Sequence, residues 1–109
     1  MNASDLLNAW NTTLSTNDEN ALGQYLSESF TFTMLGQNTM TQSAHEHLSW
    51  CVTDDSPQIS DFHILYDDGE VCSGTHAAKM ADGQMFDVMF FGEYGEKLDR
   101  WHVLLAPQG

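Results

Sequence analysis

Two stretches near the start of the chain have the apolar spacing of amphipathic helices. Residues 2–14 place apolar side chains three or four positions apart, and Asn2 or Ser4 can cap this helix. Its apolar stripe consists of Leu6, Leu7, Trp10 and Leu14. A second, shorter helix follows a cap at Asn17 or Asp18. Its stripe consists of Ala21, Leu22, Tyr25 and Leu26.

The rest of the pattern predicts one strand, one helix and then four strands. Residues 29–35 alternate apolar and polar side chains and end at Gly36, which is typical of a strand. Residues 41–52 return to helical spacing and stop before Pro57. Strands are then predicted at residues 59–66, 70–80, 84–93 and 97–105. Turn signals separate them at residues 67–69, 82–83 and 93–95.

The order of these elements predicts the fold class. Helices followed by a run of strands imply an α+β domain, in which three N-terminal helices pack on a curved, mostly antiparallel sheet. A twisted sheet backed by helices leaves a pocket between the two layers. Because 109 residues have room for one hydrophobic core, we expect a single domain spanning residues 1–109.

The turn at residues 82–83 predicts which side chains face the pocket. A two-residue hairpin turn would place Ala78 opposite Asp87. In that register Asp87 is the one carboxyl group on an apolar face, and His76 is its diagonal neighbour. A carboxyl group in such surroundings is expected to stay protonated and to donate a hydrogen bond. The alternative is that Asp87 faces solvent or forms a structural pair with His76 or Arg100.

The turn at residues 93–95 does not decide which face of the last strand points into the pocket. A two-residue turn would place His102 beside the predicted pocket carboxyl, whereas a three-residue loop with a glycine bulge would place Trp101 there. We expect Trp101 to face inward, because Trp101, Val103 and Leu105 form the more coherent apolar side.

The turn at residues 67–69 leaves a similar choice for the strand before it. Either His63 or the pair Phe62 and Ile64 faces inward. We expect the apolar pair inside and His63 at the surface.

The charge of the chain limits its partners. Its formal net charge is -13, and its only cationic side chains besides histidine are Lys79, Lys97 and Arg100. Such a chain cannot neutralise a nucleic-acid backbone or bind an anionic membrane surface. The same field repels anions at long range, which favours a neutral or cationic small molecule as ligand.

The cysteines and histidines indicate no metal or cofactor. Cys51 and Cys72 are too few for a disulfide framework and lie in apolar surroundings, so we expect buried, reduced thiols. His45 and His47 are two positions apart, which on a helix turns them to different sides, and we expect a solvated helix face there. The start of the chain has no charged leader before a long apolar run, and we expect a cytoplasmic protein.

Three segments resemble a known family. Residues 86–91 (FDVMFF), 93–95 (EYG) and 25–33 (YLSESFTFT) resemble the ketosteroid isomerases of the nuclear transport factor 2-like superfamily. The resemblance implies a cystatin-like cone of curved sheet around helices, commonly dimeric through the sheet. It covers most of the chain as an order of elements. It also implies that Asp87 occupies the position of the family's carboxylic-acid hydrogen-bond donor.

The sequence departs from that family at two positions. Thr33 stands where the isomerases have their general-base aspartate, and a hydroxyl cannot act as a base at neutral pH. Trp10, or Ala9 in the ungapped alignment, is nearest to the family's tyrosine donor. True steroid isomerisation is therefore not expected. The candidate ligand-binding residues are Trp10, Tyr25, Phe32, Thr33, Met89, Trp101 and Val103.

Two functions from different classes fit this pattern. In the first, His76 moves a proton while Asp87 and Trp10 bind a carbonyl or enol oxygen, as in an isomerase, dehydratase or cyclase step. In the second, the pocket binds a small neutral ligand without catalysis, which the loss of the base favours. A homodimer through the sheet is compatible with both. Its interface is predicted at Phe86, Val88 and Phe90.

Overall fold

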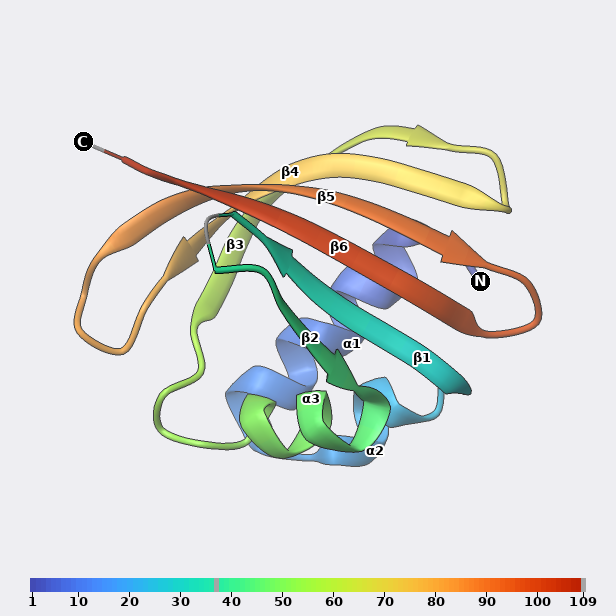
Figure 1. Ribbon diagram of the computed structural model, residues 1–109, viewed down its shortest axis with the longest axis horizontal. Helices are drawn as coiled ribbons and strands as arrows, with labels where there is room; N and C mark the ends of the chain where they lie inside the picture. The colour runs from blue at the N-terminus through green and yellow to red at the C-terminus, as the bar shows by residue number, and fades with distance from the viewer. Residues whose placement is uncertain (37, 109) are drawn as a thin grey trace.

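Three helices and six strands make up the described part of the chain. The computed structural model describes residues 1–36 and 38–108. The helices are α1 (Ala3–Thr16), α2 (Glu19–Gly23) and α3 (Ala44–Cys51), as Figure 1 shows. No helix in these described ranges is long and apolar enough to cross a membrane.

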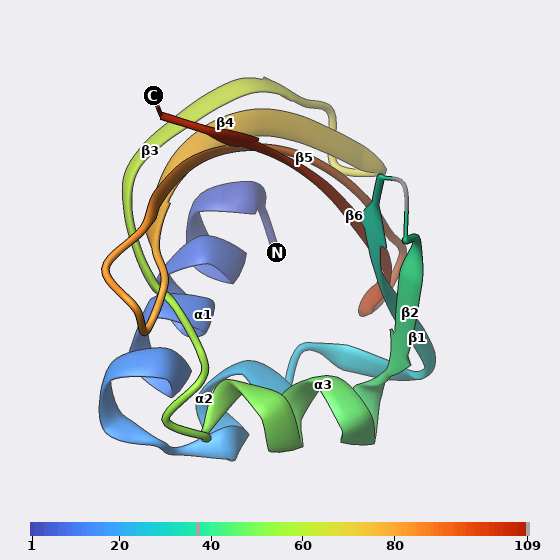
Figure 2. The same cartoon turned by 60° about the vertical axis from the view of Figure 1, so that its left-hand side comes forward.

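The six strands form one sheet that wraps around the helices. They are β1 (Leu26–Leu35), β2 (Met40–Ser43), β3 (Gln58–Asp67), β4 (Val71–Lys79), β5 (Met85–Tyr94) and β6 (Leu98–Pro107). The order across the sheet is β2-β1-β6-β5-β4-β3, and only the β1–β6 pairing is parallel. In Figure 2 the sheet arches over α1, while α2 and α3 close the lower side. The predicted α+β class with helices on a curved, mostly antiparallel sheet is confirmed.

The start of α3 differs from the prediction of a helix over residues 41–52. A capping box fixes the first turn of α3. The Glu46 N–H donates to the Ser43 hydroxyl at 3.2 Å, and the Ser43 N–H donates to the Glu46 carboxylate at 2.9 Å. The residues before this cap form β2, which pairs antiparallel with β1. The β-branched Thr41, which favours strand, lies in that segment.

The second helix also ends earlier than its apolar stripe suggests. It stops at Gly23, so Tyr25 and Leu26 do not belong to it. Leu26 begins β1, where it pairs with Leu98 of β6, and the Leu98 N–H donates to the Tyr25 carbonyl at 2.7 Å. Parallel pairing with a distant strand overrides the local helical spacing here.

The hairpin between β4 and β5 corrects the predicted register. The Met80 N–H donates to the Gln84 carbonyl and the Gly83 N–H donates to the Met80 carbonyl, both at 2.9 Å. Gly83 has a φ of 90°, so the loop has three residues and ends on a left-handed glycine. The extra loop residue places Asp87 opposite Ala77 instead of Ala78. A shift of one residue turns every side chain of β5 to the other face of the sheet.

The two faces of β5 are therefore exchanged relative to the prediction. Val88 and Phe90 are buried against the helices, and Phe86 lies on the same side. The dimer interface predicted at Phe86, Val88 and Phe90 is therefore wrong, because these side chains face the helices. Met89 is 57% exposed on the outer face, together with Asp87.

The predicted inward residues of β6 are confirmed, and those of β3 in part. Trp101 and Val103 of β6 are buried on the inner face, although Trp101 lies opposite Gly92 and not beside Asp87. Phe62 of β3 packs against the core, and His63 is exposed.

Two further predictions concern β3 and the cysteines. Ile64 is 39% exposed, so it contributes less to the core than expected. Cys51 and Cys72 are buried, free thiols, as predicted.

A polar contact fixes α1 beneath the sheet. The N–H of Ala3, the first residue of α1, donates to the Asp67 carboxylate at 2.8 Å, and the same carboxylate accepts from the Tyr94 hydroxyl. Asp67 lies at the end of β3 and Tyr94 at the end of β5. The contact fixes the position of α1, which carries Trp10, against the sheet.

Candidate ligand pocket

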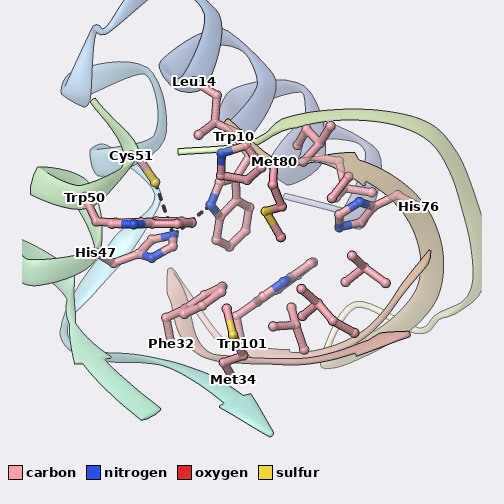
Figure 3. Close-up of a pocket in the computed structure, with 17 residues that line it drawn as sticks. Trp10, Leu14, Phe32, Met34, His47, Trp50, Cys51, His76, Met80 and Trp101 are labelled. Carbon is pink, nitrogen blue, oxygen red and sulfur yellow. Dashed lines mark hydrogen bonds between the residues drawn. The ribbon is translucent and has the colours of Figure 1, made fainter. Parts of the chain in front are cut away.

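A cavity lies between the helices and the inner face of the sheet. Its volume is about 60 Å³, several times the roughly 10–15 Å³ that one water molecule needs on the same scale. Figure 3 shows side chains from α1, α3 and the strands converging on it. The lining residues are Leu7, Trp10, Leu14, Phe32, Met34, His47, Trp50, Cys51, Pro57, Ile59, His76, Ala78, Met80, Val88, Trp101, Val103 and Leu105.

Five of the predicted site residues reach this cavity. They are Trp10, Phe32, His76, Trp101 and Val103. They come from α1, β1, β4 and β6, so the curvature of the sheet brings together residues that are far apart in the sequence. All lie on the concave side of the sheet or on the helix that faces it.

The other four predicted site residues lie outside the cavity. Asp87 is exposed on the outer face, where its carboxylate accepts from the Gln108 side-chain amide at 2.8 Å. Met89 shares that face. Thr33 lies between Phe32 and Met34, which both point inward, and its hydroxyl lies 3.1 Å from that of Thr41.

Tyr25 lies in the turn after α2, away from the lining residues. The predicted pair of His76 and Asp87 is not formed, because adjacent residues on a strand face opposite sides of a sheet and the register differs by one.

His47 is a buried part of the cavity wall, and sequence reasoning placed it at the surface. It is 1% exposed. The indole N–H of Trp10 donates to His47 Nε2 at 2.8 Å, and His47 Nδ1 donates to the Gln42 side-chain oxygen at 2.9 Å. Both ring nitrogens are thus paired, and the ring stacks on Phe32 with centroids 4.1 Å apart. Burial lowers the pKa of His47 to about 3, so the ring is neutral at physiological pH.

A signal for His47 was present in the sequence. With Ala44, Leu48 and Cys51, it occupies the i, i+3, i+4, i+7 positions of one helix face. The apolar stripe of α3 therefore passes through His47, while His45 and Glu46 point to solvent.

Cys51 lies beside this histidine but is not an activated thiol. Its sulfur is 3.4 Å from His47 Nε2, which already accepts from Trp10. Burial, with a contribution from Glu19, raises the pKa of Cys51 to about 12. A protonated, buried thiol is a weak nucleophile and acts here as an apolar wall group.

Aromatic rings form the floor of the cavity. Trp101 stacks on Phe90 with centroids 4.7 Å apart and lies at the same distance from Trp10 at a tilt. A Cβ at Gly92 would come within 2.6 Å of the six-membered ring of Trp101, so the indole lies directly over that glycine. Figure 3 shows the indole nitrogen of Trp101 on the cavity side.

His76 faces the cavity from the opposite side to His47, as Figure 3 shows. Its Nδ1 lies 3.0 Å from the Ala77 carbonyl, which can only accept, so Nδ1 carries the proton. In the neutral ring Nε2 is then a bare acceptor, and none of the described residues donates to it. Burial lowers the pKa of His76, although the bond to the Ala77 carbonyl acts in the other direction. His76 is therefore a neutral hydrogen-bond acceptor in an apolar wall.

A β-bulge fixes the surroundings of His76. Two residues of β3, Asp61 and Phe62, oppose the single residue His76 of β4. Asp61 has a φ of 57°, a left-handed conformation that is uncommon outside glycine. The bulge turns Asp61 outward and Phe62 inward, where Phe62 meets the His76 ring edge-on at 6.0 Å. Bulges commonly re-aim side chains next to functional sites.

Few groups in this cavity can take part in acid–base chemistry. No carboxylate of the described residues lines the cavity, and one of its two histidines is fully paired. Apolar and aromatic walls favour an uncharged ligand, and His76 offers it one acceptor.

Comparison with known proteins bears on the fold. No family model matches the sequence, and no curated protein matches it. Solved structures do match. An NTF2-like protein of unknown function from Cytophaga hutchinsonii is 14% identical, and the match covers 94% of this chain and 88% of that chain with a TM-score of 0.75.

Two similar structures are named for enzymes. A proposed ketosteroid isomerase from Kribbella flavida is 14% identical over 93% of this chain and 75% of that chain, with a TM-score of 0.71. SalBIII, an epoxide hydrolase/cyclase-like enzyme with a role in pyran ring formation in the polyether salinomycin, is 16% identical over 94% and 89%, also with a TM-score of 0.71. At these identities the likeness concerns the fold alone. The chain has the fold of the nuclear transport factor 2-like superfamily.

Proposed function

We propose that this protein binds a small, neutral, mostly apolar molecule in the cavity between its helices and its sheet. The observation behind the proposal is a partly open pocket with aromatic, aliphatic and sulfur-containing walls. Among the described residues, no carboxylate lines it. Burying an apolar ligand there gains about 25 cal/mol per Å² of apolar surface removed from water. A charged ligand would lose its hydration without a partner.

Toluene is a suitable first probe because it offers only apolar surface. Calorimetric titration should show binding to the wild-type protein, and Ala78→Leu, which fills the cavity, should abolish it. Thr75→Leu is the matched control, since Thr75 lies on the other face of the same strand, where it pairs with Met89. Loss of binding in both variants, or no binding to the wild type, would contradict the proposal.

Catalysis of a single proton transfer by His76 is the second candidate. Its support is the unpaired Nε2, which can accept a proton from a carbon next to a carbonyl group. A base without a second acid–base group favours exchange or isomerisation over hydrolysis. Exchange of the α-hydrogens of cyclohexanone in D₂O tests this. The exchange rate should exceed that of buffer and fall to it in His76→Gln.

We also propose that the outer face of the sheet pairs with a second copy of the chain. Exposed apolar side chains support this, because large apolar patches on a monomer usually mark an interface. They are Met85, Met89, Phe91 and Leu104. Met89 and Leu104 lie opposite each other on neighbouring strands. A dimeric mass in solution that becomes monomeric in Leu104→Lys is expected, and a monomeric wild type at micromolar concentration would contradict it.

The cytoplasmic location remains a prediction from the sequence. Two buried, free cysteines support it, since reduced thiols are typical of that compartment.

A further inference from the structure

One hydrogen-bond acceptor of the cavity wall, His76 Nε2, has no donor among the described residues. His76 is 9% exposed and lies between the rings of Phe62 and Phe90, each with its centroid 6.0 Å from that of the imidazole. Its Nδ1–H is used by the Ala77 carbonyl, so the lone pair of Nε2 is left without a donor. Every other imidazole nitrogen at the cavity belongs to His47 and is bonded within the wall.

Nε2 is the accessible atom of an otherwise buried ring in an apolar wall, so a hydrogen bond from a ligand to it would add to the affinity. We propose that the ligand of this pocket is a neutral cyclic alcohol whose hydroxyl group donates a hydrogen bond to His76 Nε2. This inference rests on the proposed binding function and adds the chemical class of the ligand to it.

The charges of the site exclude the other common donors. An ammonium group would enter a cavity that no carboxylate of the described residues lines, so its charge would be unpaired. A carboxylic acid would meet the field of a chain with net charge -13 and a neutral imidazole that gives its anion no partner. A ketone has only acceptor atoms, so it could accept from the Trp101 indole N–H but would leave Nε2 without a donor. A hydroxyl group is a neutral donor that can also accept from the Trp101 indole N–H, so it fits both polar atoms.

The walls around His76 favour a ring as the body of the ligand. Trp10 and Trp101 line the cavity with their ring centroids 4.7 Å apart, and the His76 ring packs against Phe62 and Phe90. Flat side chains of this kind pack best against a flat or compact apolar body. The bulge at Asp61 places Phe62 against the imidazole, so the backbone supports the position of the His76 ring.

Cyclohexanol and cyclohexanone form a matched pair of probes, because they share the ring and differ in whether the oxygen can donate. Calorimetric titration of the wild-type protein should give an affinity for cyclohexanol about tenfold higher than for cyclohexanone, the fold-change expected for one hydrogen bond. In His76→Leu the two affinities should become equal while toluene still binds. Asp87→Asn, on the outer face, is the control and should keep the tenfold preference.

Each result separates the two proposals. Equal affinities of the wild type for alcohol and ketone, with toluene bound, would overturn the hydroxyl assignment and leave the binding function standing. No binding of any of the three would overturn the binding function itself. The comparison within the wild type requires no variant, so a His76→Leu protein that does not fold leaves the test valid. A preference for the alcohol that persists in a folded His76→Leu protein would also overturn the assignment.

Discussion

The two histidines of the cavity wall have the same side chain and opposite situations. His47, on α3, has both ring nitrogens bonded to other side chains and is 1% exposed. His76, on β4, has one nitrogen bonded to its own neighbouring backbone and the other facing the cavity. The first connects α1 to β2 through Trp10 and Gln42, whereas the second connects nothing within the fold. His47 is therefore a structural residue, and His76 is available to a ligand.

This difference also shows what a buried histidine indicates. Burial lowers the pKa of both rings, so the direction of the shift does not distinguish them. The count of satisfied nitrogens does. A fully paired ring stabilises the native state, and a half-paired ring next to a cavity marks a binding group.

The largest expected effect comes from removing the paired histidine. His47→Leu leaves the Trp10 N–H and the Gln42 oxygen without partners, and we expect a loss of about 3 kcal/mol of unfolding free energy. His76→Leu should cost less than about 1 kcal/mol, because only a bond to an adjacent carbonyl is lost. Urea denaturation measures both. His47→Gln, which can accept and donate, should recover part of the loss. Equal losses of unfolding free energy in His47→Leu and His76→Leu would contradict the assignment of His47 alone as a structural residue.

Lowering the pH should reduce the unfolding free energy of the wild type more than that of His47→Gln, by less than the loss expected for His47→Leu. The pKa of His47 lies near 3 in the folded state and near 6.5 when unfolded, so the unfolded state binds the proton first as the pH falls. Stability from this group is complete above about pH 6.5 and declines by about 1.4 kcal/mol per unit towards pH 3. Between about pH 6.5 and 5 the wild type should therefore lose about 2 kcal/mol more than the variant. Parallel curves in urea denaturation over this range would contradict a neutral, buried His47.

The next largest effect on stability is expected at Asp61, in the bulge opposite His76. Asp61 occupies a left-handed conformation that glycine adopts freely, so Asp61→Gly should stabilise the protein by up to about 1 kcal/mol. Asp61→Val should destabilise it, because a β-branched side chain tolerates this conformation least. Thermal unfolding measures both variants. A stabilising Asp61→Val would show that the bulge is not formed.

The smallest effect is expected at Asp87. Its carboxylate is exposed and accepts from the Gln108 amide, so Asp87→Asn should change the unfolding free energy by less than about 0.5 kcal/mol. Toluene binding should not change. A clear loss of toluene affinity in this variant would favour the register in which Asp87 faces the cavity.

The elements of the fold could be predicted because their patterns are local. The stripe of α1 and the alternation of the strands each depend on residues within one element, and both predictions held. The short β2 could not be found this way. Its four residues follow a hairpin and become a strand through pairing with β1, and the helical spacing of α3 begins directly after them.

The inward face of β5 was predicted wrongly because both faces carry large apolar side chains. Met85, Met89 and Phe91 alternate with Val88 and Phe90, and the two acidic residues of the strand, Asp87 and Glu93, were the signal for the outer face. The choice depended on whether the loop before it has two residues or three, and an Asp-Gly pair occurs in both kinds of turn. Asp87 was assigned to the pocket for this reason. His76 lies on the inner face of β4 with Cys72, Gly74 and Ala78, the face on which the sequence pattern placed it.

The central claim is that His76 Nε2 can accept a hydrogen bond from a ligand in this cavity, whereas both ring nitrogens of His47 are already hydrogen-bonded within the protein. Nitrogen-15 NMR of the histidine rings tests this directly, with cyclohexanol added at neutral pH and the two residues assigned from His47→Gln and His76→Gln. Both rings should be neutral with the proton on Nδ1, and cyclohexanol should shift the Nε2 resonance of His76 and leave that of His47 in place. A proton on Nε2 of His76, or a His76 resonance that does not respond when the alcohol binds, would contradict the claim.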